Sequence, residues 1–282
     1  MMQCLHHLDD VRQISLAWRC QGQSVGLVPT MGYWHAGHLS LIRAARARCA
    51  KVVASIFINP TQFGPTEDLD CYPQDLERDL ALAQEAGVDV VFCPDAAAMY
   101  EPGHGTWVEV PELSQGLCGA SRPGHFRGVA TIVTKLFWIV VPHVAFFGEK
   151  DWQQLAIIRT MTRQLSCPVE ICACPTVREP DGLAMSSRNV YLTTEERAQA
   201  PALYAMLCHL RDLVAAGERR VDVLRTSGQQ FLARHLPLGR LDYLEIVHPE
   251  TLAPQREAAS PALAAAALFL GKARLIDNLR IA

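Results

Sequence analysis

Short apolar segments that alternate with longer helical patterns dominate the first two-thirds of the 282-residue chain. The apolar segments lack the every-second-residue alternation of a half-buried strand, and they comprise residues 24–29, 51–58, 88–93, 144–147 and 169–174. The helical patterns comprise residues 39–50, 75–86, 128–140 and 152–165. Strands without alternation are typical of parallel sheets that helices cover on both faces. The sequence therefore predicts an α/β domain with a parallel sheet.

The remainder of the chain, beyond about Thr176, has a different pattern. Helical spacing begins at Thr193 and recurs over residues 221–236. Three strand-like segments follow, at residues 241–247, 263–270 and 275–281. Helices followed by strands predict a small α+β domain with an antiparallel sheet. We therefore expect two domains, residues 1–176 and residues 177–282.

The charge balance argues against one class of function. The chain has 26 Lys and Arg residues against 29 Asp and Glu residues, which gives a formal net charge of −3. General nucleic-acid binding relies on a surplus of positive charge, so we expect no such partner. No apolar run reaches the roughly 18 residues that cross a bilayer. The first residues lack the basic and apolar regions of a secretory signal, so we expect a cytoplasmic protein without membrane contact.

The ten cysteines are scattered from Cys4 to Cys208, and none forms a Cys-x-x-Cys pair. This spacing favours reduced structural thiols over a disulfide framework or a zinc site. The densest group, Cys167, Cys172 and Cys174, falls on a segment that we expect to be a buried strand.

The strongest local motif is Pro-Thr-Met-Gly-Tyr-Trp-His-Ala-Gly-His at residues 29–38, between an expected strand and an expected helix. A helix N-terminus offers backbone N–H donors and a positive dipole end, both of which suit phosphate. Gly32 and Gly37 allow close approach of the backbone, and His35 and His38 add side-chain donors. The alternative is an ordinary helix cap with surface histidines; the strand–turn–helix setting favours phosphate binding.

Three further polar segments follow expected strand ends, where ligands of parallel sheets gather. Residues 146–154 include Lys150, which could neutralise phosphate, and Gln154; the alternative is a solvated helix start. Residues 181–189 place two serine hydroxyls beside Arg188, which suits a clamp for a triphosphate; the alternative is an ordinary polar linker between domains. Residues 59–64 present Gln62, whose amide could bind a carboxyl or hydroxyl group unless the segment is a simple turn.

Several common enzyme motifs are absent from the sequence. It contains no Gly-x-Gly-x-x-Gly, no Gly-x-x-x-x-Gly-Lys-Ser/Thr and no His-Glu-x-x-His. These absences argue against dinucleotide oxidoreductases, P-loop enzymes and zinc peptidases.

Taken together and in this order, these segments resemble the pantoate–β-alanine ligase family. The likeness covers nearly the whole chain. It includes residues 29–38, 55–64, 122–131, 146–155, 176–179, 181–191 and 271–278. An ordered set of blocks is far more specific than any one motif.

The resemblance implies a fold and a reaction. The fold is a Rossmann-like domain of the nucleotidyltransferase type at residues 1–176, with a smaller C-terminal α+β lid domain at residues 177–282. The reaction is the ATP-dependent condensation of (R)-pantoate with β-alanine through an enzyme-bound pantoyl adenylate. It gives pantothenate, AMP and diphosphate, a step of pantothenate (vitamin B5) and coenzyme A biosynthesis. Mg²⁺ is expected with the ATP, no residue is assigned as a metal ligand, and a homodimer is expected.

The resemblance also implies roles for individual residues. The expected catalytic residues are His38, as a proton donor, with His35 and Lys150. The expected ATP-binding residues are Met31, Gly32, His35, Gly37, His38, Gly148, Glu149, Lys150, Asp151, Val177, Met185, Ser186, Ser187 and Arg188. Gln62 and Gln154 are expected to hold pantoate, and Gln62 also to contact β-alanine.

Four residues depart from the family pattern. Tyr33 and Trp34 stand where smaller or aliphatic residues are usual, and Trp138 and His143 stand where Asn and Asp are usual. The first pair is expected to affect loop shape and substrate affinity. His143 precedes a buried strand and is expected to be structural.

Two alternative functions remain open on the sequence. A nucleotidylyltransferase of the same fold would adenylate a phosphate and keep AMP in its product. Gln62 and Gln154 favour a small carboxylate substrate instead, because a phosphate would call for more Arg. A nucleotide-binding regulator would need no transition-state donors, and the retained His38 and Lys150 argue against it.

Overall fold

The computed structural model describes residues 2–65 and 67–282, which divide into two compact units. The N-terminal unit comprises Met1–Pro111, Arg122–Glu149 and Ile157–Pro175. The C-terminal unit comprises Glu112–Ser121, Lys150–Ala156 and Thr176–Ala282. Each unit is described by itself.

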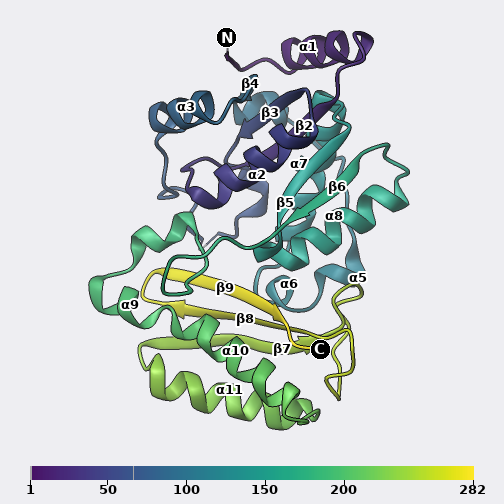
Figure 1. The fold of residues 1–282 in the computed structure, drawn as a ribbon. Coiled ribbons are helices and arrows are strands. Elements are labelled where there is room, and N and C mark those ends of the chain that lie inside the picture. The colour runs from purple at the N-terminus through teal and green to yellow at the C-terminus, as the bar shows by residue number, and fades with distance from the viewer. Residues whose placement is uncertain (1, 66) are drawn as a thin grey trace. The chain divides into compact units, whose positions relative to one another are not determined.

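The N-terminal unit is built on a six-stranded sheet in the order β1-β4-β3-β2-β5-β6 (Figure 1). The strands are β1 (Gln3–Leu5), β2 (Val25–Thr30), β3 (Lys51–Ile56), β4 (Val90–Phe92), β5 (Val144–Gly148) and β6 (Glu170–Cys174). Every pairing between them is parallel. The predicted parallel sheet is therefore confirmed, and its central strands β2 and β3 each contain four consecutive buried residues, without alternation.

Helices cover both faces of this sheet. They are α1 (Leu8–Cys20), α2 (Ala36–Arg48), α3 (Leu76–Glu85), α4 (Ala96–Met99), α7 (His125–Val140) and α8 (Trp152–Gln164), with the 3-10 turn η1 (Pro60–Gln62). On one face, Ile42 of α2 and Ala83 of α3 pack into one cluster with Val28 and Val52 of the sheet. The helix α7 packs against α1 and β2, and Thr134 of α7 hydrogen-bonds to Met161 of α8.

The order of the strands creates a switch point between β2 and β5. From β2 the chain moves outward through β3 and β4, whereas from β5 it moves in the other direction to β6. The register pairs Gly26 with Val144 and Leu27 with Ala145, so β2 and β5 end side by side. Ligands of open parallel sheets bind at such a point, beyond the carboxyl ends of the strands.

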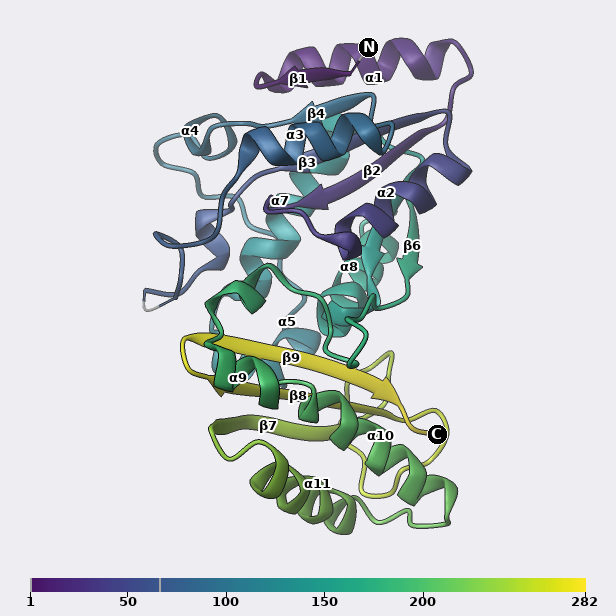
Figure 2. The ribbon, with the colours of Figure 1, turned by 60° about the vertical axis from the view of Figure 1, so that its left-hand side comes forward.

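The C-terminal unit contains the predicted antiparallel sheet, in the order β7-β8-β9 (Figure 2). Its strands are β7 (Gly239–Val247), β8 (Leu263–Leu270) and β9 (Ala273–Arg280). Its helices are α5 (Pro111–Ser114), α6 (Cys118–Ser121), α9 (Thr194–Gln199), α10 (Ala202–Ala215) and α11 (Val221–His235), with the 3-10 turn η3 (Ser187–Tyr191). The 3-10 turn η2 (Glu149–Asp151) begins in the N-terminal unit and ends in the C-terminal unit, and residues 152–156 of α8 also belong to the C-terminal unit. The helices α10 and α11 pack against the sheet, where Met206 and Leu224 meet Leu244 and Leu268 in one core.

Some elements were not predicted or differ from prediction. The strand β1 and the helix α1 lie in a segment whose sequence pattern led to no assignment. The helical stretch after Thr193 is two helices, because Pro201 stands at the start of α10. Within the described residues, no helix is long and apolar enough to cross a membrane.

The expectation for the cysteine group was wrong in part. Cys167 precedes β6, and Cys172 lies on β6 but is only half-buried. Cys174 is the one member of the three that is buried. The reason is that β6 is an edge strand of the sheet and therefore has a partner on one side only.

His143 joins β2 to the start of β5, and its structural role gives a testable prediction. Its Nδ1 accepts a hydrogen bond of 2.9 Å from the Val25 N–H. Burial, aided by the charge of Arg19, lowers the pKa of His143 below its ordinary value. The unfolded chain therefore takes up a proton on His143 more readily than the folded chain does. The stability that neutral His143 contributes is complete above about pH 6.5, the ordinary histidine pKa, and is lost as the pH falls toward the lower pKa of the folded state.

Urea unfolding at pH values above and below about 6.5 measures this effect. We expect His143→Asn to reduce the loss of unfolding free energy on acidification, because its amide oxygen can accept the same N–H without taking up a proton. The control is His7→Gln, at an exposed position. An equal acid-induced loss of stability in wild type and His143→Asn would contradict the account.

Candidate functional site

The loop between β2 and α2 is held by a buried carboxylate. Asp79, on α3, accepts hydrogen bonds of 2.7 Å from the backbone N–H groups of both Tyr33 and Trp34. The residue is only 1% exposed. Burial raises the pKa of Asp79 above its ordinary value, although the two N–H donors act in the opposite direction. Asp79 therefore fixes the backbone of residues 33 and 34 just before the histidine pair.

Trp34 and Gly32 fit this loop for different reasons. Trp34 is fully buried, and its Nε1–H donates to Thr30 Oγ1 over 2.8 Å. Gly32 has a φ of +88°, and a Cβ there would lie 3.0 Å from Ile56 Cγ2. The departures at residues 33 and 34 thus have a structural explanation: Trp34 is part of the core under the loop, and Tyr33 adopts a φ of 52° beside the Arg78 guanidinium.

His35 and His38 form a reciprocal cap at the start of α2. The Gly37 N–H donates to His35 Nδ1 over 3.1 Å, and the His35 N–H donates to His38 Nδ1 over 3.3 Å. The two rings lie with their centroids 4.2 Å apart. Because each Nδ1 accepts, each neutral ring carries its proton on Nε2. The cap and the donor function are therefore compatible: one nitrogen shapes the helix start, and the other is an N–H donor.

The segment Glu149–Asp151 follows the carboxyl end of β5, the strand that pairs with β2. Gly148 ends β5, and η2 (Glu149–Asp151) follows it directly. Within the C-terminal unit, Asn278 Nδ2 donates to the Lys150 backbone oxygen over 2.9 Å. Gly148, Glu149 and Lys150 are all partly exposed. The backbone of Lys150 is thus tied to β9 while its side chain remains partly accessible.

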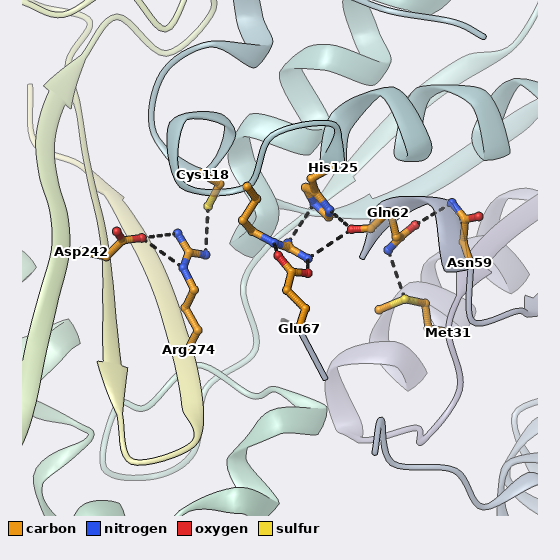
Figure 3. Close-up of polar contacts among 9 residues, drawn as sticks. Met31, Asn59, Gln62, Glu67, Cys118, His125, Asp242 and Arg274 are labelled. Atoms are coloured by element: carbon orange, nitrogen blue, oxygen red, sulfur yellow. Dashed lines mark hydrogen bonds and ion pairs between the residues drawn. The ribbon is translucent and has the colours of Figure 1, made fainter. Parts of the chain in front are cut away.

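Gln62 is held by a network of polar contacts in the N-terminal unit (Figure 3). Its side-chain oxygen accepts from Asn59 Nδ2 over 3.1 Å, and its Nε2 donates to Met31 Sδ over 3.1 Å. His125 donates from Nδ1 to the Gln62 backbone oxygen over 2.8 Å. The structure thus brings Gln62 and Met31, two residues expected at the site, into direct contact.

An ion pair supports the same network. Arg122 Nη1 lies 3.0 Å from His125 Nε2, and Arg122 Nε donates to Glu67 over 2.7 Å. Burial acts to raise the pKa of Glu67, but the hydrogen bonds and charge of Arg122 outweigh it and leave the pKa below its ordinary value. Glu67 is therefore ionised at neutral pH and anchors Arg122 beside His125.

Gly128 permits α7 to touch η1. Its backbone oxygen accepts from Asn59 Nδ2 over 3.1 Å. A Cβ at this position would lie 2.5 Å from the Thr61 backbone oxygen and 2.7 Å from the Gln62 nitrogen. Only a residue without a side chain fits here, so Gly128 sets the position of the turn that carries Gln62.

The two adjacent glutamines of α8, Gln153 and Gln154, have different environments. Gln153 is buried; it accepts from the Cys118 N–H over 3.0 Å and donates to the Leu113 and Gly116 carbonyls, each over 2.8 Å. Gln154 is partly exposed. Gln153 is thus committed to the fold of the C-terminal unit, whereas the side chain of Gln154, the expected substrate ligand, is partly accessible.

The segment 177–188 is a hairpin followed by a short turn. The Met185 N–H donates to the Val177 carbonyl over 3.0 Å, and the backbones of Arg178 and Ala184 pair as an isolated antiparallel β-bridge. Ser186 Oγ accepts the Arg188 N–H over 3.3 Å at the start of η3. Ser187 is buried, whereas Met185, Ser186 and Arg188 are partly exposed. The expected phosphate-clamp residues therefore share one compact local structure.

Arg178 braces this hairpin. It forms a two-pronged ion pair with Asp277, with N–O distances of 2.6 and 3.0 Å, and its guanidinium lies 3.6 Å from the Tyr204 ring centre. Burial raises the pKa of Asp277, with Arg178 acting against that shift. The same C-terminal unit contains a second Arg–Asp pair, Arg274 with Asp242, at 2.7 Å (Figure 3). Both pairs lie within the C-terminal unit, and the Arg178–Asp277 pair joins the hairpin to β9.

The expected site residues are distributed over both units. The N-terminal unit holds Met31, Gly32, His35, Gly37, His38, Gln62, Gly148 and Glu149, and the C-terminal unit holds Lys150, Asp151, Gln154, Val177, Met185, Ser186, Ser187 and Arg188. Sequence reasoning did not single out Asp79, His125 or Arg178 as supports. The sequence did contain one sign of the role of Asp79. It lies on the same buried face of α3 as Ala83, four residues further on, and a charged residue on a buried face needs hydrogen-bond or charge partners.

Comparison with known proteins identifies the family. The model of the pantoate-beta-alanine ligase family matches residues 3–280. A pantothenate synthetase from Oleidesulfovibrio alaskensis is 58% identical over 280 residues, covering 99% of this chain and 100% of the relative. A pantothenate synthetase from Nitratidesulfovibrio vulgaris (strain Miyazaki F) is 55% identical, covering 100% of this chain and 99% of the relative.

Solved structures agree with the sequence relatives. The crystal structure of pantothenate synthetase from Thermus thermophilus superposes with a TM-score of 0.93 at 48% identity and covers 99% of each chain. A pantoate-beta-alanine ligase from Francisella tularensis, solved with beta-gamma ATP and β-alanine, gives a TM-score of 0.82 at 32% identity, covering 100% of this chain and 98% of that one. The fold class, the ligase activity and the resemblance predicted from the sequence are confirmed, and the chain belongs to the pantoate–β-alanine ligase family.

Proposed function

We propose that this ligase makes pantothenate in two chemical steps at the switch point between β2 and β5. The pantoate carboxylate first attacks the α-phosphorus of ATP, which releases diphosphate and leaves pantoyl adenylate. The amine of β-alanine then attacks the acyl carbon, which releases AMP. The observation that carries the proposal is the His35–His38 cap at the first residue of α2, directly beyond β2.

The first step depends on positioning and charge neutralisation. A carboxylate is already ionised at pH 7, so it needs no base. The phosphate gains negative charge as the bond to diphosphate breaks. The Nε2–H groups of His35 and His38, the N-terminus of α2 and the Lys150 ammonium are donors or charges of the kind that stabilises this state. We assign catalysis to His38, His35 and Lys150.

Substrate binding is assigned to two further groups of residues. Gln62 and Gln154 are proposed to bind pantoate, with Gln62 also contacting β-alanine. The ATP contacts are assigned to Met31, Gly32, Gly37, Gly148, Glu149, Asp151, Val177, Met185, Ser186, Ser187 and Arg188. The relative from Francisella tularensis was solved with beta-gamma ATP and β-alanine, which supports ATP and β-alanine as substrates.

The metal is proposed to arrive with the nucleotide. Mg²⁺ usually binds through substrate phosphates and only one or two carboxylates. In the described part of the chain, no three His, Cys, Asp or Glu side chains are preassembled as a metal site. We therefore treat MgATP as the substrate. We also propose that the chain acts as a cytoplasmic homodimer and that residues 177–282 form a lid over residues 1–176, which would protect the adenylate from water.

Diphosphate exchange tests the adenylate intermediate. With ATP, Mg²⁺ and pantoate but no β-alanine, labelled diphosphate should enter ATP, because adenylation is reversible while the intermediate stays bound. Omission of pantoate should abolish the exchange. Exchange that appears only when β-alanine is added would contradict a separate adenylation step, and exchange without pantoate would indicate a different nucleotidyl acceptor.

A further inference from the structure

Two adjacent polar residues of β9 hold two separate segments of the C-terminal unit. They are Asp277 and Asn278, which are only 3% and 9% exposed. The strand β9 is an edge strand of its sheet, and side chains of successive strand residues point to opposite faces. One edge strand therefore offers anchors on both of its sides, and the proposed mechanism assigns no role to either residue.

Asp277 holds the hairpin that leads into the proposed phosphate clamp. Its carboxylate accepts from Arg178 Nη1 over 2.6 Å and from Arg178 Nη2 over 3.0 Å. Arg178 Nη1 also donates to the Gly182 carbonyl over 3.2 Å, and the guanidinium stacks 3.6 Å from the centre of the Tyr204 ring. A two-pronged pair with a stacked guanidinium specifies its geometry closely. The hairpin is thus fixed to β9.

Asn278 holds the backbone of Lys150. Its Nδ2 donates to the Lys150 carbonyl over 2.9 Å, across 128 positions of the sequence. Lys150 lies in η2, ahead of α8, and is partly exposed. Because this bond is made to the main chain, it fixes the point from which the Lys150 side chain extends.

The two anchors are themselves joined. The Asn278 N–H donates to Asp277 Oδ1 over 2.8 Å, and the same oxygen accepts from Arg178. Burial raises the pKa of Asp277, while the hydrogen bonds and charge of Arg178 and the charge of Lys150 act against that shift. The carboxylate therefore interacts with a charge from each of the two segments.

We propose that Asp277 and Asn278 are positioning residues for the adenylation step. Together they fix the distance between Lys150 and residues 185–188. This inference rests on the proposed function, in which both segments contact the phosphates of one ATP. Preorganised charges stabilise a transition state only when they are aimed at it, and a misplacement of about 1 Å costs about 10² in rate. A shared anchor on one strand keeps both segments in place.

A double-variant cycle tests the Asn278 arm. Diphosphate release in a single turnover with MgATP and pantoate measures adenylation. We expect Asn278→Ala to slow this step by about 10² when Lys150 is present. In the Lys150→Ala background the same change should have almost no effect, because the side chain that Asn278 positions is absent. A general loss of stability would instead slow adenylation by the same factor in both backgrounds.

Arg178→Lys tests the Asp277 arm. Lysine keeps a positive charge beside the buried carboxylate, but it cannot form the two-pronged pair. We expect KM for ATP to rise about tenfold, the scale of one lost charge-assisted hydrogen bond. Hydrogen exchange at the Met185 N–H, which donates to the Val177 carbonyl, should become faster by a similar factor. The rise in KM should persist in Lys150→Ala, since this arm acts through residues 185–188. An unchanged KM for ATP would overturn this arm.

Leu232→Ala is the matched control for stability. Leu232 lies on α11 in the core of the C-terminal unit and belongs to neither segment. This variant should unfold more easily and keep the wild-type rate of adenylation. If Asn278→Ala does not fold, Asn278→Leu, which has about the same size as the original residue, takes its place.

The cycle separates failure of this proposal from failure of the proposed function. Wild-type adenylation in Lys150→Ala alone would refute the catalytic role of Lys150, and with it a positioning role of Asn278. A slow Lys150→Ala in which Asn278→Ala still lowers the rate by its full factor would overturn the positioning role alone. So would an Asn278→Ala that is as fast as wild type.

Discussion

His38→Ala is expected to lower the rate of pantoate adenylation by about 10² or more, the scale for loss of one positioned donor. The variant loses an Nε2–H donor, and it also loses the Nδ1 acceptor that receives the His35 N–H. Single-turnover formation of AMP and diphosphate measures the chemical step, and thermal unfolding checks the fold. Near wild-type adenylation would remove His38 from the mechanism.

Two further substitutions separate the two nitrogens of His38. The amide oxygen of His38→Asn can accept the His35 N–H near the position of Nδ1, but this variant has no donor near Nε2. His38→Gln extends an amide donor toward the position of Nε2. We expect His38→Asn to remain slow and His38→Gln to recover part of the rate. Full recovery by His38→Asn would show that the residue acts only as a helix cap.

Gly128→Ala is expected to raise KM for pantoate and to lower kcat/KM by about 10², the cost of misplacing a binding group by about 1 Å. The new Cβ would lie 2.5 Å from the Thr61 carbonyl oxygen, so η1 and with it Gln62 must move. Overpacking of this kind also costs about 1–3 kcal/mol of unfolding free energy. Steady-state kinetics with pantoate and ATP varied separately measures the effect, and KM for ATP should change much less.

The control for this prediction is Gly105→Ala. A Cβ at Gly105 would meet only the Gly103 carbonyl at 3.8 Å, which is an ordinary contact. It should leave the kinetics unchanged. Unaltered pantoate kinetics in a stable Gly128→Ala would contradict the positioning role of the α7–η1 contact. An equal rise in KM for both substrates would point to general loosening of the N-terminal unit.

The parallel sheet could be predicted because burial on both faces leaves a visible mark in the sequence. Strands such as β2 and β3 contain apolar stretches that do not alternate with polar residues. The strand β1 leaves no such mark, because it has three residues, lies at the sheet edge and contains Gln3. Its place is set by pairing with β4, far away in sequence.

The site shows the same division between local and long-range information. The cap formed by His35 and His38 joins residues three apart, and the sequence had offered it only as the alternative to phosphate binding. The support that Asp79 gives to Trp34 spans 45 residues, and the contact of His125 with Gln62 spans 63. A single sequence does not pair such positions. For that reason the sequence did not show that Trp34 is a core residue.

The most direct test of the account is the product balance of the purified chain. ATP, Mg²⁺ and (R)-pantoate are supplied with and without β-alanine, and AMP, diphosphate and pantothenate are quantified over many turnovers. The account predicts sustained turnover only with β-alanine, with one pantothenate formed for each AMP and each diphosphate. AMP retained in the product, or turnover without pantothenate, would contradict it.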